Sequence, residues 1–419
     1  EYSQEVAAWA ATYHALVGFL MPLIGVAMVT YFFGEERSLK PALEVVPLCL
    51  VAGISFAIPY WVSAWFITAE FPSLIGSMVG GTITVGLLNA GFLRPETEWE
   101  FPERDRWKDH WVGDIEPGGE GMSGSESSDM SLLKAWSPYI ILVVLLVVTR
   151  AVDAISNPIN NPENAVSFSI DGIGEFVIGV VLNWNGILGF SDLSGGISLV
   201  NVPGFWLFIS ALIAVVIFGM PGNKVAAAWK EAGQKLVAPF IALVFVIGMV
   251  QVMLNAGTYY GIEGLVGESP PPAVIEQGAS DIWKNANMIE VLAVATAETL
   301  GNVYPAIASL IGALGAAMTG SNTVSNLTFS QFQFTAAEQL SIPTQIVVGA
   351  QAVGGAIGNL IAIHNVVAAV ATVGLVGQEG RVIRLNLIPV AYYAGMVGIL
   401  TMLFSFVFFP DLFTILPGF

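Results

Sequence analysis

The sequence predicts an all-α polytopic membrane protein with about eight transmembrane spans, a re-entrant hairpin and a broken helix. Of its 419 residues, 55% are hydrophobic and only 11% are charged, whereas a soluble domain carries about 25% charged residues. Apolar runs long enough to cross the roughly 30 Å of hydrocarbon in a bilayer recur along the chain. Two runs are interrupted by small and polar residues, as in transporters with inverted repeats, of which this chain would resemble one and a half halves.

The apolar runs give the order of the helices. The predicted single spans are residues 10–33, 42–68, 72–93, 136–152, 202–220, 235–255 and 382–409. Pro22, Pro47 and Pro59 fall inside these spans, where we expect them to kink the helices. His14 lies close to the end of its span, and residues 288–300 are expected to form a short interfacial helix.

Lysine and arginine in the loops predict the orientation, because short basic loops stay in the cytoplasm. The predicted organisation is transmembrane helices over 1–93, an acidic cytoplasmic loop over 94–134, transmembrane helices over 135–256 with an extracellular segment over 153–201, an extracellular loop over 257–286, a substrate region over 287–377 and a last transmembrane helix over 378–419. The amino terminus is then outside, as expected of a chain that lacks earlier spans.

The charge is strongly negative. The net charge is −18, and 11 of the 32 acidic residues lie in residues 94–130. Salt screens such charges from one another, so we expect a halophilic source; the alternative is a disordered acidic loop in an ordinary organism. No basic patch exists, which excludes a nucleic-acid partner. The single cysteine, Cys49, excludes disulfides within the chain.

A polar break follows the apolar residues 304–317. Hydrocarbon cannot satisfy backbone N–H and C=O groups, so such a break must face protein or a watery cavity. We predict a hairpin with arms over 304–319 and 327–339 and its tip over 320–326. The candidate substrate-binding residues here are Thr319, Gly320, Ser321, Asn322, Thr323, Ser325 and Asn326. The alternative is that the small residues only let helices pack closely.

A second break is predicted between residues 342–353 and 365–376. Its candidate substrate-binding residues are Gly354, Gly355, Gly358 and Asn359, because glycine lets a ligand approach the backbone closely. His364 and Asn365 are candidate ion-coupling residues, for H⁺ or Na⁺, and no other cofactor is predicted. The alternatives are a neutral His364 ring bonded to backbone and asparagines that cap the half-helices.

These two breaks resemble the lactate permease family. Residues 319–326 are similar to the family's Thr-Gly-Ser-Asn/Asp-Thr-Ser-Ser-Asn tip, Gly354, Gly355 and Gly358 match its glycines, and residues 372–379 are similar to its Gly-Leu-Val-Gly-Lys-Glu stretch. Specific motifs cover about the last 80 residues, so the chain resembles the carboxy-terminal two-thirds or so of a member, and a missing amino-terminal half is expected. The family's lysine near residues 359–365 has no counterpart here.

The resemblance implies a multi-pass protein of the cell membrane that works as a symporter. Its expected substrate is a small carboxylate, namely lactate or a related hydroxy-monocarboxylate such as glycolate. The alternatives are a transporter of another small anion and a truncated, non-transporting membrane remnant. An enzyme is not expected, because the sequence has no His-Glu-x-x-His and no other clustered catalytic or metal-binding pattern.

Overall fold

A computed structural model shows two compact units, which we call the larger unit (Glu1–Gly121 with Phe240–Phe419) and the smaller unit (Met122–Pro239). The structure describes residues 2–67, 69–95, 99–108, 111, 131–152, 154–155, 166–179, 181–189, 194–198, 203–255, 287–373, 375 and 377–412. Most of the predicted acidic loop and all of the predicted loop 257–286 lie outside the described residues.

Four of the first five helices of the larger unit have a proline in their first turn. These helices are α1 (Tyr2–Gly18), α2 (Met21–Phe33), α3 (Lys40–Glu44), α4 (Val46–Phe66) and α5 (Pro72–Asn89). Pro22 and Pro47 lie in the first turns of α2 and α4, and Pro59 alone of the three lies inside a helix. Proline suits a first turn because the N–H that it lacks would have no partner there. The prediction that all three prolines lie within continuous helices was therefore wrong for two of them.

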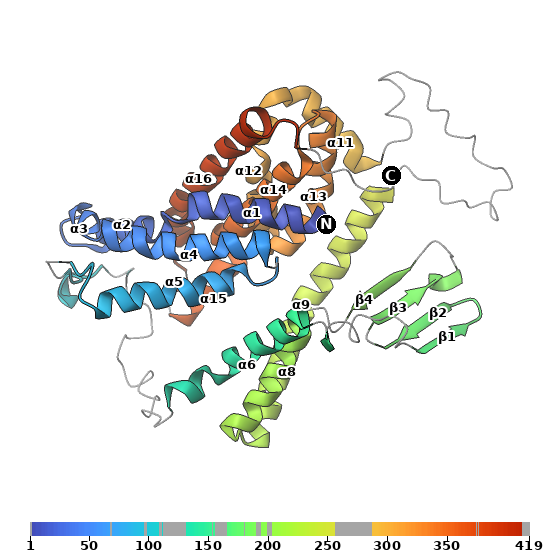
Figure 1. Cartoon of the computed structure of the whole chain (residues 1–419), viewed down its shortest axis with the longest axis horizontal. Coiled ribbons are helices and arrows are strands. Elements are labelled where there is room, and N and C mark those ends of the chain that lie inside the picture. Colours follow the sequence, from blue (N-terminus) through green and yellow to red (C-terminus); the bar gives the residue numbers. More distant parts are fainter. Residues whose placement is uncertain are drawn as a thin grey trace. The chain divides into compact units, whose positions relative to one another are not determined.

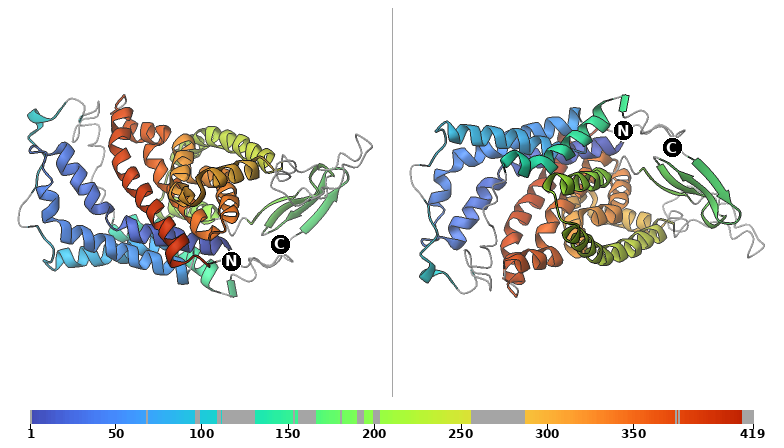
Figure 2. Two further views of the ribbon diagram at one scale, coloured as in Figure 1. Left: turned by 90° about the horizontal axis from the view of Figure 1, so that it is seen from above. Right: turned by 90° about the horizontal axis from the view of Figure 1, so that it is seen from below.

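The predicted first span is bent, as expected at Pro22. Helices α1 and α2 meet at 41°. Pro22 has no N–H to donate to the carbonyl of Gly18, so the helical bonding pattern stops there. Helix α1 packs against α4, and α4 packs against α5 (Figure 1, Figure 2).

The second part of the larger unit contains the predicted substrate region. Its elements are α11 (Met288–Leu300), a 3-10 segment over Gly301–Ala306, α12 (Ala308–Thr319), α13 (Asn322–Gln339), α14 (Thr344–Gly358), a 3-10 turn over Asn359–Ile361, α15 (Ile363–Thr372), α16 (Glu379–Leu403) and a π-helical turn over Phe404–Phe408. The predicted short helix 288–300 is confirmed as α11. Asn287 and Glu290 form a capping box at its start, because each side chain bonds the backbone N–H of the other.

Helix α14 is the centre of this unit. Twelve of its fifteen residues are buried, among them Ile346, Val347 and Val353. It packs against α1, α12, α13 and α16 (Figure 1). Because its neighbours surround it, its side chains provide most of the contacts that hold the hairpin and the amino-terminal helices together.

Glycines bring α12 and α14 into backbone contact. A Cβ atom at Gly354 would overlap the carbonyl oxygen of Ser309, and one at Gly358 would overlap that of Ala313. On the facing helix, a Cβ at Gly312 would overlap the carbonyl oxygen of Gln351. Small residues at a helix crossing allow this approach. Gly354 and Gly358 thus serve close helix packing, the alternative stated for the small residues of the hairpin tip, and their role in ligand approach stays a prediction.

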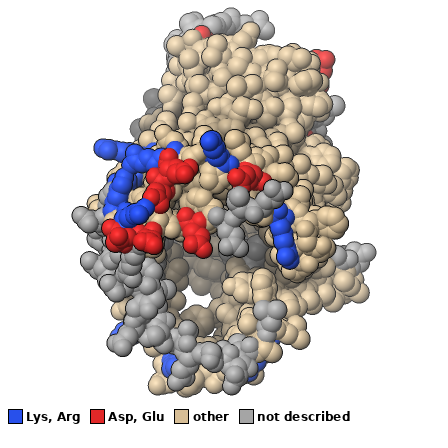
Figure 3. Space-filling view, turned by 90° about the vertical axis from the view of Figure 1, so that its left-hand side faces the viewer, with Lys and Arg blue, Asp and Glu red and all other residues tan. Residues whose placement is uncertain are grey.

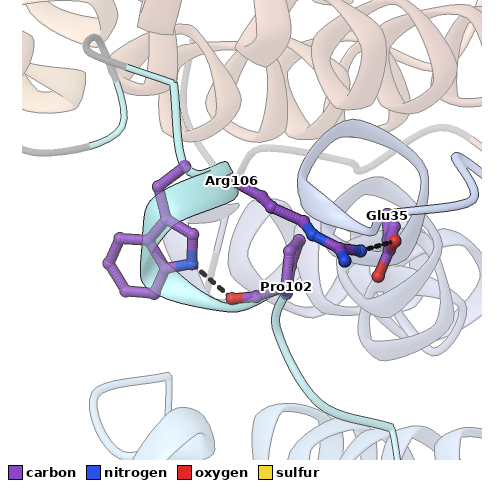
Figure 4. Close-up of polar contacts among 4 residues, drawn as sticks. Glu35, Pro102 and Arg106 are labelled. Carbon is purple, nitrogen blue, oxygen red and sulfur yellow. Dashed lines mark hydrogen bonds and ion pairs between the residues drawn. The ribbon is translucent and has the colours of Figure 1, made fainter.

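Charged residues are concentrated in one band of the surface, and most of the visible face carries other side chains (Figure 3). Arg106 forms an ion pair with Glu35, and the indole N–H of Trp107 donates to the carbonyl of Pro102 at 2.6 Å (Figure 4). The sequence assigned the loops that carry Glu35 and Arg106 to the cytoplasmic side. Their contact requires that they lie on the same side, and which side this is stays a prediction.

The smaller unit contains a sheet, so the all-α fold class was wrong in this respect. Four antiparallel strands in the order β1-β2-β3-β4 cover Val166–Ile170, Gly174–Ile178, Val181–Asn185 and Gly195–Ser198. Phe168 pairs with Phe176, which pairs with Trp184, and these three rings stack across the sheet. The unit also contains α6 (Leu132–Ala151) and α8 (Pro203–Phe218), which pack together, and the first part of α9 (Gly222–Asn255).

Several helices could cross a membrane. Within the described residues, three are long and apolar enough, over Val46–Phe66, Thr344–Ile361 and Glu379–Phe408, and two bent pairs raise the number to five. Shorter apolar helices occur over Leu133–Thr149, Gly204–Phe218 and Val244–Met253. These helices are compatible with a polytopic helical membrane protein, and the count of about eight spans stays a prediction.

The backbone contact predicts that Gly354→Ala destabilises the protein. We expect a loss of about 1–3 kcal/mol, the usual range for overpacking, seen as a lower Tm of the purified protein in detergent. Gly395→Ala in α16 is the matched control, because a Cβ there meets no atom within 4 Å and alanine favours the helix. Equal Tm values for the two variants would contradict the packing role of Gly354.

Candidate functional site

The hairpin break is narrower than predicted. Gly320 ends α12 in a left-handed conformation with φ 66°, and Ser321 caps α13 by accepting a hydrogen bond from the N–H of Val324 at 3.3 Å. Residues 322–326 therefore belong to the first turns of α13. The tip is reduced to Gly320 and Ser321, because serine at an N-cap starts the next helix at once.

The second break lies later in the chain than predicted. Helix α14 continues through Gly354 and Gly355 to Gly358, and regular α-helix is lost only over residues 359–362. The break begins with the 3-10 turn over Asn359–Ile361. The glycines did not interrupt the helix because their contacts with α12 hold them in helical conformation.

The two breaks meet at Gly320, and we call this meeting point the junction. A Cβ atom at Gly320 would overlap the imidazole of His364. Asn365 Nδ2 donates to the carbonyl of Gly320 at 3.3 Å and to Asn359 Oδ1 at 3.4 Å. His364 is exposed rather than deep in the protein. The structure thus brings Gly320, Asn359, His364 and Asn365 together, as the two predicted breaks require.

Two asparagines of α13 lie beside the junction helices. Asn326 Nδ2 donates to Asn322 Oδ1 at 3.2 Å. A Cβ atom at Gly355 would overlap Asn322 Oδ1 and would lie 3.5 Å from Asn326 Oδ1. Asn326 Oδ1 is buried and has no hydrogen-bond partner among the described residues. A buried, unpaired amide oxygen can accept a hydrogen bond from a bound hydroxyl or coordinate a cation.

The other predicted site residues lie apart from this arrangement. Thr319 and Thr323 are exposed, and the Thr319 hydroxyl donates to the carbonyl of Gly315 at 2.7 Å. Ser325 is fully buried and donates to the carbonyl of Gly312 at 2.8 Å. Gly354 and Gly358 serve the α12–α14 contact described above.

A buried polar network beside the asparagines was missed by the sequence analysis. Gln351 Nε2 donates to Ser325 Oγ at 3.1 Å, and Gln333 Nε2 donates to Gln351 Oε1 at 3.1 Å. The Tyr304 hydroxyl donates to Gln333 Oε1. All four side chains have 0% exposure. Glutamines inside otherwise apolar helices were the available signal, because such residues must pair when they are buried.

The segment that forms the junction offers backbone dipoles and few fixed charges. Between residues 301 and 377, Glu338 is the only Asp, Glu, Lys or Arg. Helices α13 and α15 begin at the junction, and a helix N-terminus carries a partial positive charge and free N–H groups. Such an end binds anions. No group of three His, Cys, Asp or Glu that could hold a metal occurs among the described residues.

Two hollows of the larger unit lie elsewhere. Two apolar grooves of about 410 and 620 Å³ run along α1 and α4, and both are lined by Thr12, Leu16 and Trp61. Their lining includes none of the predicted site residues. Apolar grooves of this kind are expected on a surface that faces lipid.

Comparisons with known proteins cover nearly the whole chain. The family model described as L-lactate permease matches residues 2–408. The glycolate permease of Escherichia coli is 26% identical over 94% of this chain and 65% of its own length. The L-lactate permease of Bacillus subtilis is 23% identical over 94% of this chain and 65% of its own length. No solved structure matches.

These matches correct two expectations. The specific motifs lie in about the last 80 residues, but the family match begins at residue 2, so the expected resemblance to the carboxy-terminal two-thirds alone is not supported. For the same reason, the expectation of a missing amino-terminal half is not supported: the first helices belong to the matched region. The chain spans about 65% of the length of the relatives it matches.

The buried network predicts that Gln333→Leu destabilises the protein. The change leaves Gln351 Oε1 and the Tyr304 hydroxyl without their partner, which we expect to cost about 1–3 kcal/mol. Gln331→Leu on the same helix is the matched control, since Gln331 is exposed. Thermal unfolding in detergent measures both. A Gln333→Leu variant as stable as the control would show that the network does not hold the hairpin.

Proposed function

We propose, because the chain belongs to the L-lactate permease family, that it is a secondary active transporter of lactate or a related small hydroxy-monocarboxylate such as glycolate. It is a multi-pass protein of the cell membrane, with several helices able to cross a bilayer. Relatives named L-lactate permease and glycolate permease support this substrate class. Membership of a permease family also favours transport over catalysis.

The observation that carries the proposal is the meeting of two helix breaks at Gly320. Interrupted helices that start at one point direct N–H groups and positive dipole ends toward a shared space. We assign the substrate carboxylate to the starts of α13 and α15. This arrangement needs no lysine, which is consistent with the absence of Asp, Lys and Arg from residues 301–377.

Polar side chains next to the helix starts would orient the substrate. Asn322 and Ser321 lie at the start of α13 and offer amide and hydroxyl groups. The unpaired Asn326 Oδ1 is a suitable acceptor for the substrate hydroxyl. Satisfying a buried acceptor is worth about 1–3 kcal/mol, which favours hydroxy acids over simple carboxylates. Thr323 and Thr319 are exposed, and we propose that they lie at the rim of the site.

The coupling ion is proposed to be H⁺ or Na⁺, with His364 and Asn365 as the coupling residues of the junction. The carbonyl of Gly320 and Asn359 Oδ1 both lie within hydrogen-bond distance of Asn365 Nδ2. Carbonyl oxygens at helix ends are the ligands that transporters use for sodium. His364, packed on Gly320, offers a ring that can bind a proton. No further cofactor is proposed.

Asn322→Ala is expected to abolish uptake of labelled lactate into proteoliposomes. The change removes an amide at the start of α13 and leaves Asn326 Nδ2 without its partner. Thr328→Ala is the matched control, because Thr328 lies farther along α13 and bonds its own helix at Val324. Equal membrane insertion of both variants shows that folding is intact. Normal uptake by Asn322→Ala would show that the hairpin is not part of the substrate site.

Competition tests the substrate class. Unlabelled glycolate should reduce lactate uptake about as strongly as unlabelled lactate does, because both present one carboxylate and a neighbouring hydroxyl. Propionate, which has the carboxylate but no hydroxyl, should compete about tenfold less, since the buried amide oxygen then stays unpaired. Stronger competition by phosphate or a dicarboxylate than by glycolate would favour a transporter of another small anion.

A further inference from the structure

His14 lies at the middle of a bent span. It is one turn before the end of α1 at Gly18, and α2 leaves at 41°. The sequence placed it near a span end, but the bent pair runs from Tyr2 to Phe33. Its Nδ1 is 2.6 Å from the hydroxyl oxygen of Tyr393 on α16. Ionisable side chains at such positions are costly to keep and commonly belong to a transport pathway.

The structure makes room for this contact. A Cβ atom at Gly18 would lie 2.9 Å from the Tyr393 hydroxyl. On the neighbouring residue of α16, the Tyr392 hydroxyl donates to the carbonyl of Val17 at 3.0 Å. The two tyrosines therefore join α16 to the last turn of α1, where Pro22 has removed a backbone donor. The contact between α1 and α16 is polar at the bend.

The groups around His14 are neutral. The rings of Tyr60 on α4 and Tyr393 on α16 pack against it, with centroids 6.0 and 5.7 Å away. Helices α4 and α14, which also pack on α1, contain no Asp, Glu, Lys, Arg or His. The charged residues of α16 are Glu379, Arg381 and Arg384 in its first two turns, and α1 has Glu5 more than two turns away.

Tyrosine is a partner that permits two charge states. Its hydroxyl donates to an unprotonated ring nitrogen and accepts from a protonated one. A carboxylate partner would instead hold the proton permanently. A positive charge on His14 would have no counter-charge among the groups named above, so it would be costly to keep in this position. Protonation therefore favours any conformation in which the ring contacts water or substrate.

We infer that His14, paired with Tyr393, is a proton-binding position of the transporter, where proton binding is linked to movement of α1 against α16. The inference rests on the proposed function. It adds a second candidate proton-binding position besides His364 at the junction. This position lies at the bend between α1 and α2, which the sequence motifs did not single out. Proton binding at His14 would promote the step that returns or opens the carrier, and substrate binding would stay at the junction.

The test uses the whole chain in proteoliposomes and labelled lactate in two assays. Counterflow at equal pH on both sides measures substrate binding and exchange, and accumulation driven by a pH gradient measures coupling. We expect the counterflow rate of His14→Gln to stay within about threefold of that of the unchanged chain and its accumulation of lactate to fall about tenfold. A tenfold loss lies within the usual range of coupling between two binding sites. Its counterflow should also lose its dependence on pH between about pH 5 and 8.

Three further variants make the result decisive. Tyr393→Phe keeps the ring but removes the hydroxyl, and we expect its pH profile to shift by at least about half a unit. Tyr392→Phe is the matched control, because it removes a hydroxyl from the same bend and should leave the profile unchanged. If His14→Gln does not reach the membrane, the contrast between these two tyrosine variants decides the matter. His364→Gln shows whether the junction contributes separately.

The outcomes separate the inference from the function on which it rests. A His14→Gln or Tyr393→Phe protein with the pH profile and accumulation of the unchanged chain overturns the inference, whatever His364→Gln does. A profile lost or shifted in these variants and kept in Tyr392→Phe supports it. Absence of lactate counterflow in the unchanged chain would instead reject the proposed substrate. Repeating the series with glycolate then tests His14 independently of lactate.

Discussion

The backbone contact between α12 and α14 is the constraint on which the site depends. Gly312, Gly354 and Gly358 remove the side chains that would keep the two helices apart. Because the helices cross so closely, their last residues end near one another, and the interruptions that follow them also meet. The backbone contact between α12 and α14 therefore determines where the two helix starts at Gly320 and His364 lie. A larger residue at any of these glycines would separate the two halves of the proposed site.

Two neighbouring sets of polar side chains serve different purposes, one for stability and one for the proposed function. The network of Tyr304, Gln333, Gln351 and Ser325 is fully buried, and its hydrogen bonds satisfy one another. Beside it, Asn326 keeps an oxygen without a partner. A satisfied network makes a rigid support, whereas an unsatisfied acceptor remains available to a ligand. The same helices thus hold their position without using the groups that we assign to the substrate.

Three of the helix interruptions in the described part of the larger unit have different causes. Pro22 removes a donor between α1 and α2, Gly320 adopts a left-handed conformation between α12 and α13, and a 3-10 turn at Asn359 separates α14 from α15. In each case another element supplies a polar partner: Tyr392 at the first break, Asn365 at the second, and Asn386, whose Nδ2 donates to the carbonyl of Leu360, at the third. Breaks that are supported in this way can rearrange without leaving buried groups unpaired, which is a useful property in a carrier.

The amino-acid sequence alone determined the membrane class, the family, the helix at 288–300 and the existence of two breaks near 320 and 360, because hydrophobic length and polar interruption are local properties. It also contained an unused signal for the sheet, since apolar and polar residues alternate over Val166–Ile170, which is followed by Asp171-Gly172, a hairpin turn with φ 74° at the glycine.

Only the tertiary structure decided which glycines pack and which residues meet. Gly354 and Gly355 continue a helix because α12 confines them, and His14 is paired because α16 brings Tyr393 to it. Such contacts join residues up to 379 positions apart, and no local pattern specifies them.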